Sequence, residues 1–484
     1  MPDLYQMISL LPILILLVLS IWRGVKTGIY GGFLITVLLF FLRGSTFMAF
    51  LAALFNAFIG TINILMIIFG AVFLYHILEQ KGYVDGIKSS LAEIHPDRYF
   101  RFFFLTLFLT AFFESVAGFG TPGAIVPLLL ISLGFSPGLS IAVVLLIDGF
   151  FAVSGAVGTP VIAGLQTPLN LSANSVSQIY LYATLSLLVA GVSVFFFIYK
   201  FLRQDEGKAP GKSGWILYLA IMIPFFVLSS FLLELSGLVA AIFMAAVAYI
   251  FLFQNKKIPW QPWTPYLFLV LLLLIPKIFP WFSDFLKSYT FQFTNLYGLD
   301  VNASLQPFSS PLIPFLLSAA FALYRVRNFR IDLKPVVSKT FTVFLVLFPS
   351  LAITQLMLSK SPEFPSMIDA LAGMFVAAGD FYPLFSPVIG VLGAFITGST
   401  TVSNIIFGSV QNSTALSLNL NPDIILSLQL AGASLGNAIC LFNIIAAAAV
   451  AGVENYGEIL RKNLLPVLIA SLIIAGVGYL LISF

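Results

Sequence analysis

Two short polar segments rich in glycine interrupt an otherwise apolar chain. The first covers residues 114–122 (ESVAGFGTP) and the second covers residues 397–404 (TGSTTVSN), about 280 residues further on. Each follows one apolar stretch and precedes another. Paired interruptions in corresponding halves are typical of membrane carriers built from internal repeats. Broken helices expose backbone N–H groups and half-helix dipoles, which can hold an anion without a fixed positive charge.

The composition places this chain in a lipid bilayer. Hydrophobic residues make up 60% of its 484 residues and charged residues only 9%, whereas a soluble domain has roughly 25% charged residues. Its apolar runs approach the ~20 residues that a helix needs to span a bilayer, which predicts an all-α polytopic membrane protein with about 11 to 13 spans. We expect a multi-pass protein of the plasma (cell) membrane. The net charge of +4 is spread over short loops, which fits cytoplasmic loops rather than a nucleic-acid partner.

The positions of the polar segments and basic loops predict an inverted repeat. The apolar runs on either side of each polar segment are too short to cross alone. Residues 101–134 and 386–416 therefore suggest two re-entrant helical hairpins, whose non-helical tips must be buried in protein or line a cavity. Assigning basic loops to the cytoplasm gives the two hairpins opposite orientations. The expected organisation is an N-terminal span (1–27), repeat 1 with the first hairpin (28–203), middle spans and an outer loop (204–307), and repeat 2 with the second hairpin (308–484).

The two hairpin tips supply the predicted substrate contacts. Glycines let the backbone approach a ligand closely, hydroxyl and amide groups can bind an anion, and Phe119 would cover an apolar side of the ligand. No Lys or Arg is positioned within a span to bind a carboxylate, which favours a monoanion. Small residues in membrane helices also serve as packing contacts, and that alternative stays open for any single glycine. The predicted contacts are Gly118, Phe119, Gly120, Thr121, Gly398, Ser399, Thr400, Thr401, Ser403, Asn404 and Asn437.

Two acidic residues within apolar runs, Glu114 and Asp148, are candidates for ion coupling. An Asp at the middle of a membrane helix costs ~2.5–3.5 kcal/mol even on mild insertion scales, so such residues usually have a function. Burial favours the neutral form of a carboxyl group, so protonation can follow substrate occupancy. Structural alternatives are that Asp148 caps the turn at Gly118–Thr121 and that backbone amides at a helix N-terminus satisfy Glu114.

The two polar segments resemble those of the L-lactate permease family. Residues 114–122 are similar to the family's "GAAGFGAP"-type hairpin, and residues 395–407 (FITGSTTVSNIIF) are similar to its "FxTGSxTxSNxxF" hairpin. This resemblance implies proton-coupled uptake of L-lactate, glycolate or a similar 2-hydroxycarboxylate. A more distant resemblance to the ion-transporter superfamily implies an elevator motion and a possible homodimer.

The chain departs from the family pattern at three places. Asp148 begins a segment where the family has an Asn–Thr–Ala–Pro stretch, Thr400 replaces an acidic residue, and the family's Gly-Lys pair near the C-terminus is Gly436-Asn437 here. These departures leave open a Na⁺-coupled carboxylate transporter or a carrier of another small organic anion.

Other functional classes find little support. Two His residues and one Cys, far apart in sequence, provide no catalytic or metal-binding set, so we expect neither an enzyme nor a metal site. The sequence has no Walker-type phosphate-binding motif, so ATP would not drive transport directly, and we expect no cofactor. The remaining prediction is a secondary active symporter.

Overall fold

The computed structural model describes residues 4–23, 25–91, 94–118, 120–207, 210–253, 259–299, 301–324, 331–361 and 364–483. These residues form a helical protein, as predicted, with one small exception: a two-stranded antiparallel sheet in the expected outer loop. Its strands are β1 (Phe291–Phe293) and β2 (Ala303–Leu305), which pair Phe291 with Leu305. Three-residue strands are too short to show an alternating sequence pattern, so the sequence did not indicate them.

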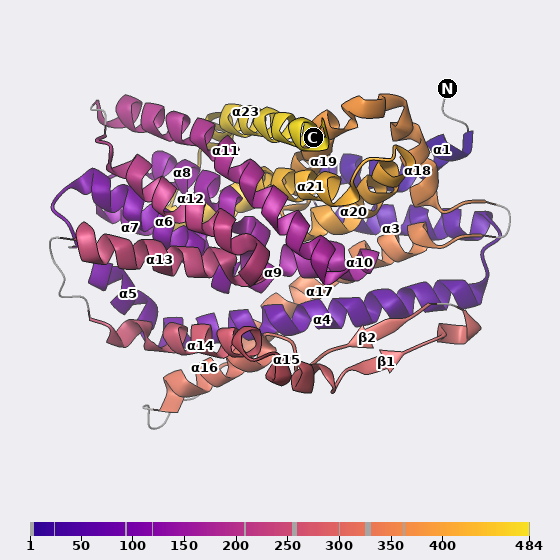
Figure 1. Cartoon of the computed structure of the whole chain (residues 1–484), viewed down its shortest axis with the longest axis horizontal. Helices are drawn as coiled ribbons and strands as arrows, with labels where there is room; N and C mark the ends of the chain where they lie inside the picture. The colour runs from indigo at the N-terminus through magenta and orange to yellow at the C-terminus, as the bar shows by residue number, and fades with distance from the viewer. Residues whose placement is uncertain are drawn as a thin grey trace.

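The first half of the chain contains two very long helices, α4 and α11, and a series of shorter ones between them (Figure 1). The helix pair α6–α7 packs side by side, and the following span is broken after α8. The elements are α1 (Leu4–Ser9), α2 (Leu11–Arg23), α3 (Val25–Leu42), α4 (Phe47–Gln80), α5 (Tyr83–Leu91), α6 (Arg98–Val116), α7 (Thr121–Ser132), α8 (Pro137–Phe151), η1 (Ala152–Ser154), α9 (Gly155–Val161), η2 (Ile162–Gln166), α10 (Thr167–Leu169) and α11 (Ala173–Glu206).

The middle section is a pair of adjacent helices followed by shorter elements. Helices α12 and α13 pack against each other, and Leu233, with φ 48°, lies at the turn between them. The elements are α12 (Ser213–Leu232), η3 (Leu233–Leu235), α13 (Ser236–Phe251), η4 (Gln261–Trp263), α14 (Thr264–Ile278), α15 (Pro280–Lys287) and η5 (Leu296–Gly298), which lies between the two strands.

The second half follows the same order of elements as the first. A long helix and a short one precede a side-by-side helix pair, then a broken span and a final long helix follow. The elements are α16 (Leu312–Tyr324), α17 (Lys334–Leu358), α18 (Met367–Phe375), η6 (Val376–Phe381), α19 (Tyr382–Thr397), α20 (Thr400–Ser417), α21 (Pro422–Gly436), α22 (Leu441–Ala451) and α23 (Tyr456–Ser483). Figure 1 places α6, α7 and α8 in the left part of the molecule and α18 and α20 in the right part, with α4 and α11 reaching across both.

The helix starts follow from local sequence. Side-chain oxygens at the N-cap accept hydrogen bonds from otherwise unpaired backbone N–H groups of the first turn. Asp97 serves this role for α6, Ser136 for α8, Ser172 for α11 and Asn421 for α21. A Pro at the start of α8 and of α21 is favourable there because that position needs no N–H donor.

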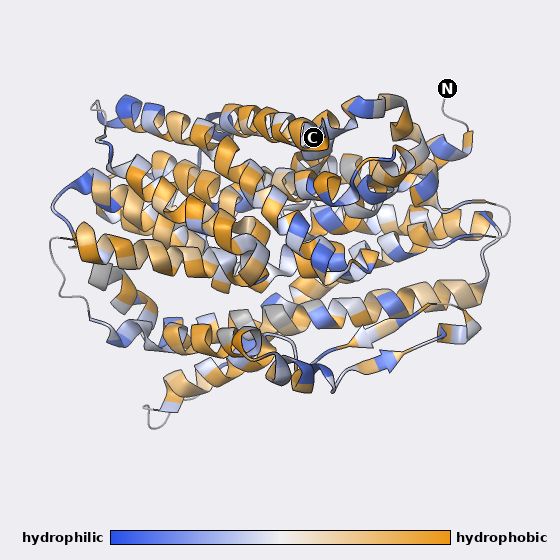
Figure 2. Cartoon of the chain, viewed as in Figure 1, coloured by the Kyte–Doolittle hydropathy of each residue, from blue (hydrophilic) through white to orange (hydrophobic). Residues whose placement is uncertain are grey.

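Seven helical segments of the described chain are long and apolar enough to cross a membrane, and six further apolar helices have only 10 to 17 residues. Figure 2 shows apolar residues over most helices, with polar residues at the connecting loops and around α10 and α20. The most apolar window of residues 137–169 is 100% buried inside the protein, against 39% for α23. The broken span is therefore an inner element surrounded by protein, where interrupted helical backbone is tolerated.

Candidate substrate and ion site

The first tip, residues 117–120, joins α6 to α7 and leaves a helix N-terminus open. Gly118 and Gly120 both adopt left-handed backbone angles, with φ 57° and 78°. A methyl group at Gly118 would lie 3.0 Å from the backbone N and the Cβ of Ala156, whereas Gly120 has nothing within 4 Å. No side chain caps α7, which begins at the half-buried Thr121. Thr121 N already donates to Gly118 O (3.0 Å) and Pro122 has no N–H, so the backbone N–H groups that this end of α7 can offer to an anion start at Gly123. Phe119 lies outside the described residues.

The first break, residues 152–158, interrupts the span that follows the α6–α7 helix pair. Ala156, Val157 and Gly158 have left-handed angles, with φ 42°, 55° and 75°. Such a conformation costs roughly 1–2 kcal/mol for a residue with a side chain, so the surrounding contacts must hold it. Hydropathy alone predicts one continuous span over residues 138–163, so this break is a difference from the sequence-based expectation. The glycines at 155 and 158, just before Pro160, were the signal for the break.

The acid pair, Glu114 and Asp148, lies beside the first break. Glu114 is in the last turn of α6 and Asp148 is near the end of α8; they are 6% and 5% exposed. Helices α6 and α8 pack against each other, which brings the two carboxyl groups close enough to interact, and a methyl group at Gly155 would overlap Glu114 Oε1. The structural alternative for Glu114, satisfaction at a helix N-terminus, is wrong because Glu114 lies at the C-terminal end of its helix.

The second tip is formed by Gly398 and Ser399, which join α19 to α20. Gly398 has φ 71°, and the Ser399 hydroxyl accepts a hydrogen bond from Val402 N (3.3 Å) as the N-cap of α20. Thr400 is buried and accepts a hydrogen bond from Asn437 Nδ2 (2.8 Å). Thr401 is buried beside it, 5% exposed. Ser399 is thus a structural cap for α20 in addition to a tip residue.

Ser403 and Asn404 are hydrogen-bonded within the protein. The Ser403 hydroxyl donates to Gly390 O (3.1 Å) and accepts from Gln429 Nε2 (3.2 Å). Asn404 Nδ2 donates to Pro160 O (3.0 Å), and this bond joins α20 to the segment after the first break. Both side chains hold the second hairpin in place, and Asn404 connects the two halves of the chain.

A buried amide network behind the second hairpin was missed by the sequence analysis. Gln411 Nε2 donates to Gln429 Oε1 (2.9 Å), and the Tyr382 hydroxyl donates to Gln411 Oε1 (2.7 Å). Two glutamines in apolar helical runs were the available signal, because a buried amide needs partners.

The second break, residues 437–440, separates α21 from α22. Asn437 donates to Thr400, while its Oδ1 is buried and has no hydrogen-bond partner among the described residues. Asn443 Nδ2 donates to Asn437 O (3.3 Å). Ser434, near the end of α21, donates to Gly149 O (2.7 Å), adjacent to Asp148. The second break is therefore bonded to the second tip through Asn437 and Thr400, and α21 is bonded through Ser434 to the residue next to Asp148.

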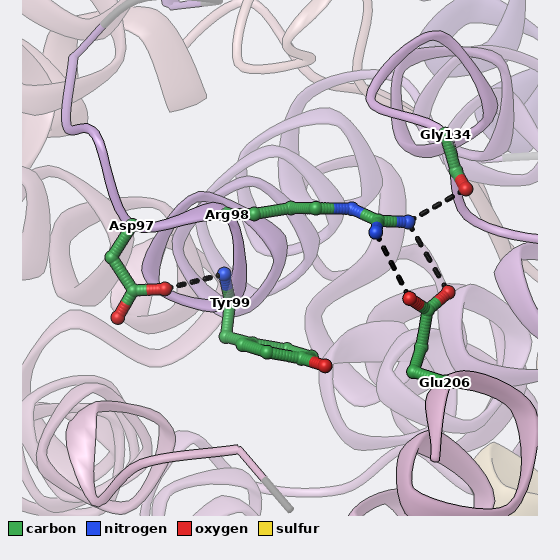
Figure 3. A network of polar contacts seen from close by, with 5 residues as sticks. All are labelled: Asp97, Arg98, Tyr99, Gly134 and Glu206. Atoms are coloured by element: carbon green, nitrogen blue, oxygen red, sulfur yellow. Dashed lines mark hydrogen bonds and ion pairs between the residues drawn. The ribbon is translucent and has the colours of Figure 1, made fainter. Parts of the chain in front are cut away.

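The base of the first hairpin is held by Arg98 (Figure 3). Its guanidinium donates to both Glu206 carboxylate oxygens (2.9 and 3.2 Å) and to Gly134 O (2.6 Å). These bonds tie the start of α6 and the end of the hairpin to the end of α11. The neighbouring Asp97 accepts a hydrogen bond from Tyr99 N (2.8 Å) as the N-cap of α6.

Polar helix breaks that meet inside an apolar, multi-helix protein define a multi-pass membrane transport protein. In the described chain, no group of three or more His, Cys, Asp or Glu residues could hold a metal ion. The sequence model of the L-lactate permease family matches residues 5–262 and 259–484. The chain belongs to this family, which confirms the resemblance of the two hairpin sequences, and it is a transporter of the plasma membrane.

Similar proteins align over most of their length. A putative L-lactate permease of Haemophilus influenzae is 27% identical, covering 88% of each chain. The L-lactate permease of Bacillus subtilis is 27% identical, covering 84% of this chain and 82% of the relative. The glycolate permease GlcA of Escherichia coli is 25% identical, covering 95% of this chain and 92% of the relative.

Proposed function

We propose that this transporter is a symporter that moves L-lactate, glycolate or a similar short 2-hydroxymonocarboxylate together with a proton. The observation that carries the proposal is the acid pair: Glu114 and Asp148 lie on the adjacent helices α6 and α8, both buried, and Glu114 lies against Gly155 of the first break. The names of the relatives, L-lactate permease and glycolate permease, support the substrate class.

The substrate carboxylate would bind at the open N-terminus of α7, next to Gly120. Backbone N–H groups and the helix dipole favour a negative charge there. The hydroxyls of Thr121 and Thr401 are close to the two tips and can donate to the substrate. Asn437 Oδ1, a buried acceptor with no partner in the described chain, suits the α-hydroxyl of the substrate, which is a donor. Ser399, Ser403 and Asn404 would position the second hairpin, and Thr400 would position Asn437.

The acid pair would carry the proton. Two neighbouring carboxylates in a buried site are costly to ionise together, so the pair would keep one proton until it is exposed to water or its charge is balanced. Binding of an anion near the pair strengthens this requirement. The positive charge of the proton then offsets the negative charge of the monoanion, so the two can cross the low-dielectric interior together with little net charge.

Reciprocal packing supports an inverted repeat with two re-entrant hairpins. Segment α9, which begins within the first break, and η2 after it pack on α20 of the second hairpin, while α22, which follows the second break, packs on α7 of the first hairpin. Each half thus supplies a half-helix to the hairpin of the other half. We infer an elevator motion, in which the hairpins and broken spans move as one body against the remaining helices.

The test is uptake of labelled L-lactate and glycolate into proteoliposomes that contain the purified protein, with an inward proton gradient and no sodium. The proposal predicts accumulation that a protonophore abolishes. Accumulation that requires added Na⁺ and is not reduced by the protonophore would contradict proton coupling and favour the sodium alternative. Accumulation of neither acid under either gradient would contradict the substrate assignment.

A further inference from the structure

A third acidic residue, Glu234, lies against the first break at Gly158, whereas Glu114 of the acid pair lies against Gly155. It is in η3, at the turn between α12 and α13. A methyl group at Gly158 would overlap Glu234 Cβ and would lie 2.6 Å from the Tyr180 hydroxyl. The absence of a side chain at Gly158 therefore lets Glu234 and Tyr180 approach the broken backbone.

Glu234 also lines a cavity of about 310 Å³. Val157 of the first break and Lys287 of α15 line the same cavity. The titratable or charged side chains that face this region are Tyr180 from α11 and Lys287 from α15. The cavity gives Glu234 a place to exchange protons with water, whereas the acid pair is nearly fully buried.

Polar groups continue from Glu234 toward the acid pair. Gly237 lies one helical turn after Glu234, and a methyl group there would lie 2.6 Å from Ser115 Oγ and 2.7 Å from Ser154 Oγ. Ser115 follows Glu114 in sequence, and Ser154 precedes Gly155, which contacts Glu114. The two hydroxyls therefore occupy the space between η3–α13 and the acid pair.

Three buried oxygens along this line have no hydrogen-bond partner within the described part of the protein: Tyr180 OH, Ser115 Oγ and Asp148 Oδ1. Their residues are 0%, 1% and 5% exposed. Buried polar atoms in native proteins are almost always paired, and ordered water is the usual partner when no protein group is available. A short chain of water molecules around the interrupted helix would supply hydrogen-bond partners to these three oxygens.

We propose that Glu234 is a proton-relay residue that connects the cavity to the Glu114–Asp148 pair through Tyr180, Ser154, Ser115 and intervening water. The inference rests on the proposed proton symport. A proton that arrives at the Glu234 carboxylate from the cavity is passed along the hydroxyls and water to the acid pair, and the reverse transfer releases it. No bond other than O–H bonds forms or breaks, and each relay group returns to its starting state when the next proton arrives.

The experiment compares two rates in proteoliposomes: net L-lactate uptake driven by a proton gradient, and exchange of labelled for unlabelled L-lactate at equal pH on both sides. Exchange can proceed with the proton kept on the carrier, whereas net uptake requires protonation and release. We expect Glu234→Gln to lower net uptake by about 100-fold, the lower end of what a positioned proton donor contributes, with exchange within twofold of wild type. Tyr180→Phe should show a smaller defect of the same kind.

Matched controls separate the relay from structural effects. Glu454→Gln makes the same chemical change at an exposed site, and Tyr182→Phe makes the same change two residues from Tyr180; neither should alter either rate. A parallel loss of net uptake and exchange in Glu234→Gln, or no loss in either, would overturn the relay. If Glu234→Gln does not fold, a Tyr180→Phe variant with unchanged net uptake would overturn the proposed proton path from Glu234 to the acid pair. An uptake rate of the wild type that is the same with and without the proton gradient would instead contradict the proposed function itself.

Discussion

Gly118→Ala tests whether the packing of the first tip on the first break is required. Alanine at φ 57° costs roughly 1–2 kcal/mol because its Cβ crowds the following carbonyl. The new methyl group would also lie 3.0 Å from both the N and the Cβ of Ala156, and overpacking of this kind costs about 1–3 kcal/mol. We therefore expect a total destabilisation of about 2–5 kcal/mol and a strong loss of uptake.

Two control variants divide this effect into its parts. Gly82→Ala, in the turn after α4, and Gly120→Ala have similar backbone angles, φ 72° and 78°, but each new methyl group would meet nothing within 4 Å. Each should lose only about 1–2 kcal/mol. Gly82→Ala should leave the KM for L-lactate unchanged, whereas Gly120→Ala should raise it because the methyl group occupies the open end of α7.

The assay is the thermal unfolding midpoint of each purified variant in detergent, together with the KM and rate of uptake in proteoliposomes. The unfolding midpoints of Gly82→Ala and Gly120→Ala should be similar to each other. The midpoint of Gly118→Ala should be clearly lower than both. A Gly118→Ala midpoint equal to that of Gly120→Ala would refute the close packing of the tip on Ala156.

Three further changes probe the positioning contacts. Ser403→Ala removes a hydroxyl that bonds to Gly390 and Gln429, and it should lower stability by about 1–3 kcal/mol with little change in KM; a raised KM at full stability would mean that Ser403 contacts substrate. Asn404→Ala breaks the bond to Pro160, so the uptake rate should fall more than KM rises, as measured by initial rates over a range of L-lactate concentrations. Arg98→Lys loses the two-bond contact with Glu206. Because the pair is partly exposed, the unfolding midpoint should fall by the equivalent of only about 0.5–1 kcal/mol. An unchanged midpoint would show that the contact does not stabilise the hairpin base.

The sequence was sufficient to locate the features that depend on local chemistry. Glycines next to hydroxyl-bearing residues marked both tips, and the carboxyl groups of Glu114 and Asp148 were identified from their presence in apolar runs. Their approach to each other could not be foreseen, because it depends on how α6 packs against α8. The sequence likewise could not show that Ser403 points to Gly390 and Gln429, since that direction follows from the packing of α20 on its neighbours.

The first break and Glu234 were missed for a different reason. Residues 138–163 are apolar throughout apart from Asp148 and a few small polar residues, so hydropathy alone indicates one continuous helix. The left-handed angles of Ala156 and Val157 are imposed by tertiary contacts, among them the approach of the first tip. Glu234 is near the end of an apolar run, where an acidic residue usually meets water. The turn at Leu233 and the missing side chain at Gly158 bring it instead against the first break.

The most direct test of the account is a count of protons moved with L-lactate by the wild type and by the Asp148→Asn variant. A pH-sensitive dye in weakly buffered proteoliposomes records the protons, and labelled L-lactate records the substrate. The account predicts a fixed ratio of protons to L-lactate for the wild type, and for Asp148→Asn no net accumulation but continued exchange of labelled substrate. Proton movement with L-lactate at the wild-type ratio in Asp148→Asn would contradict the role of the acid pair.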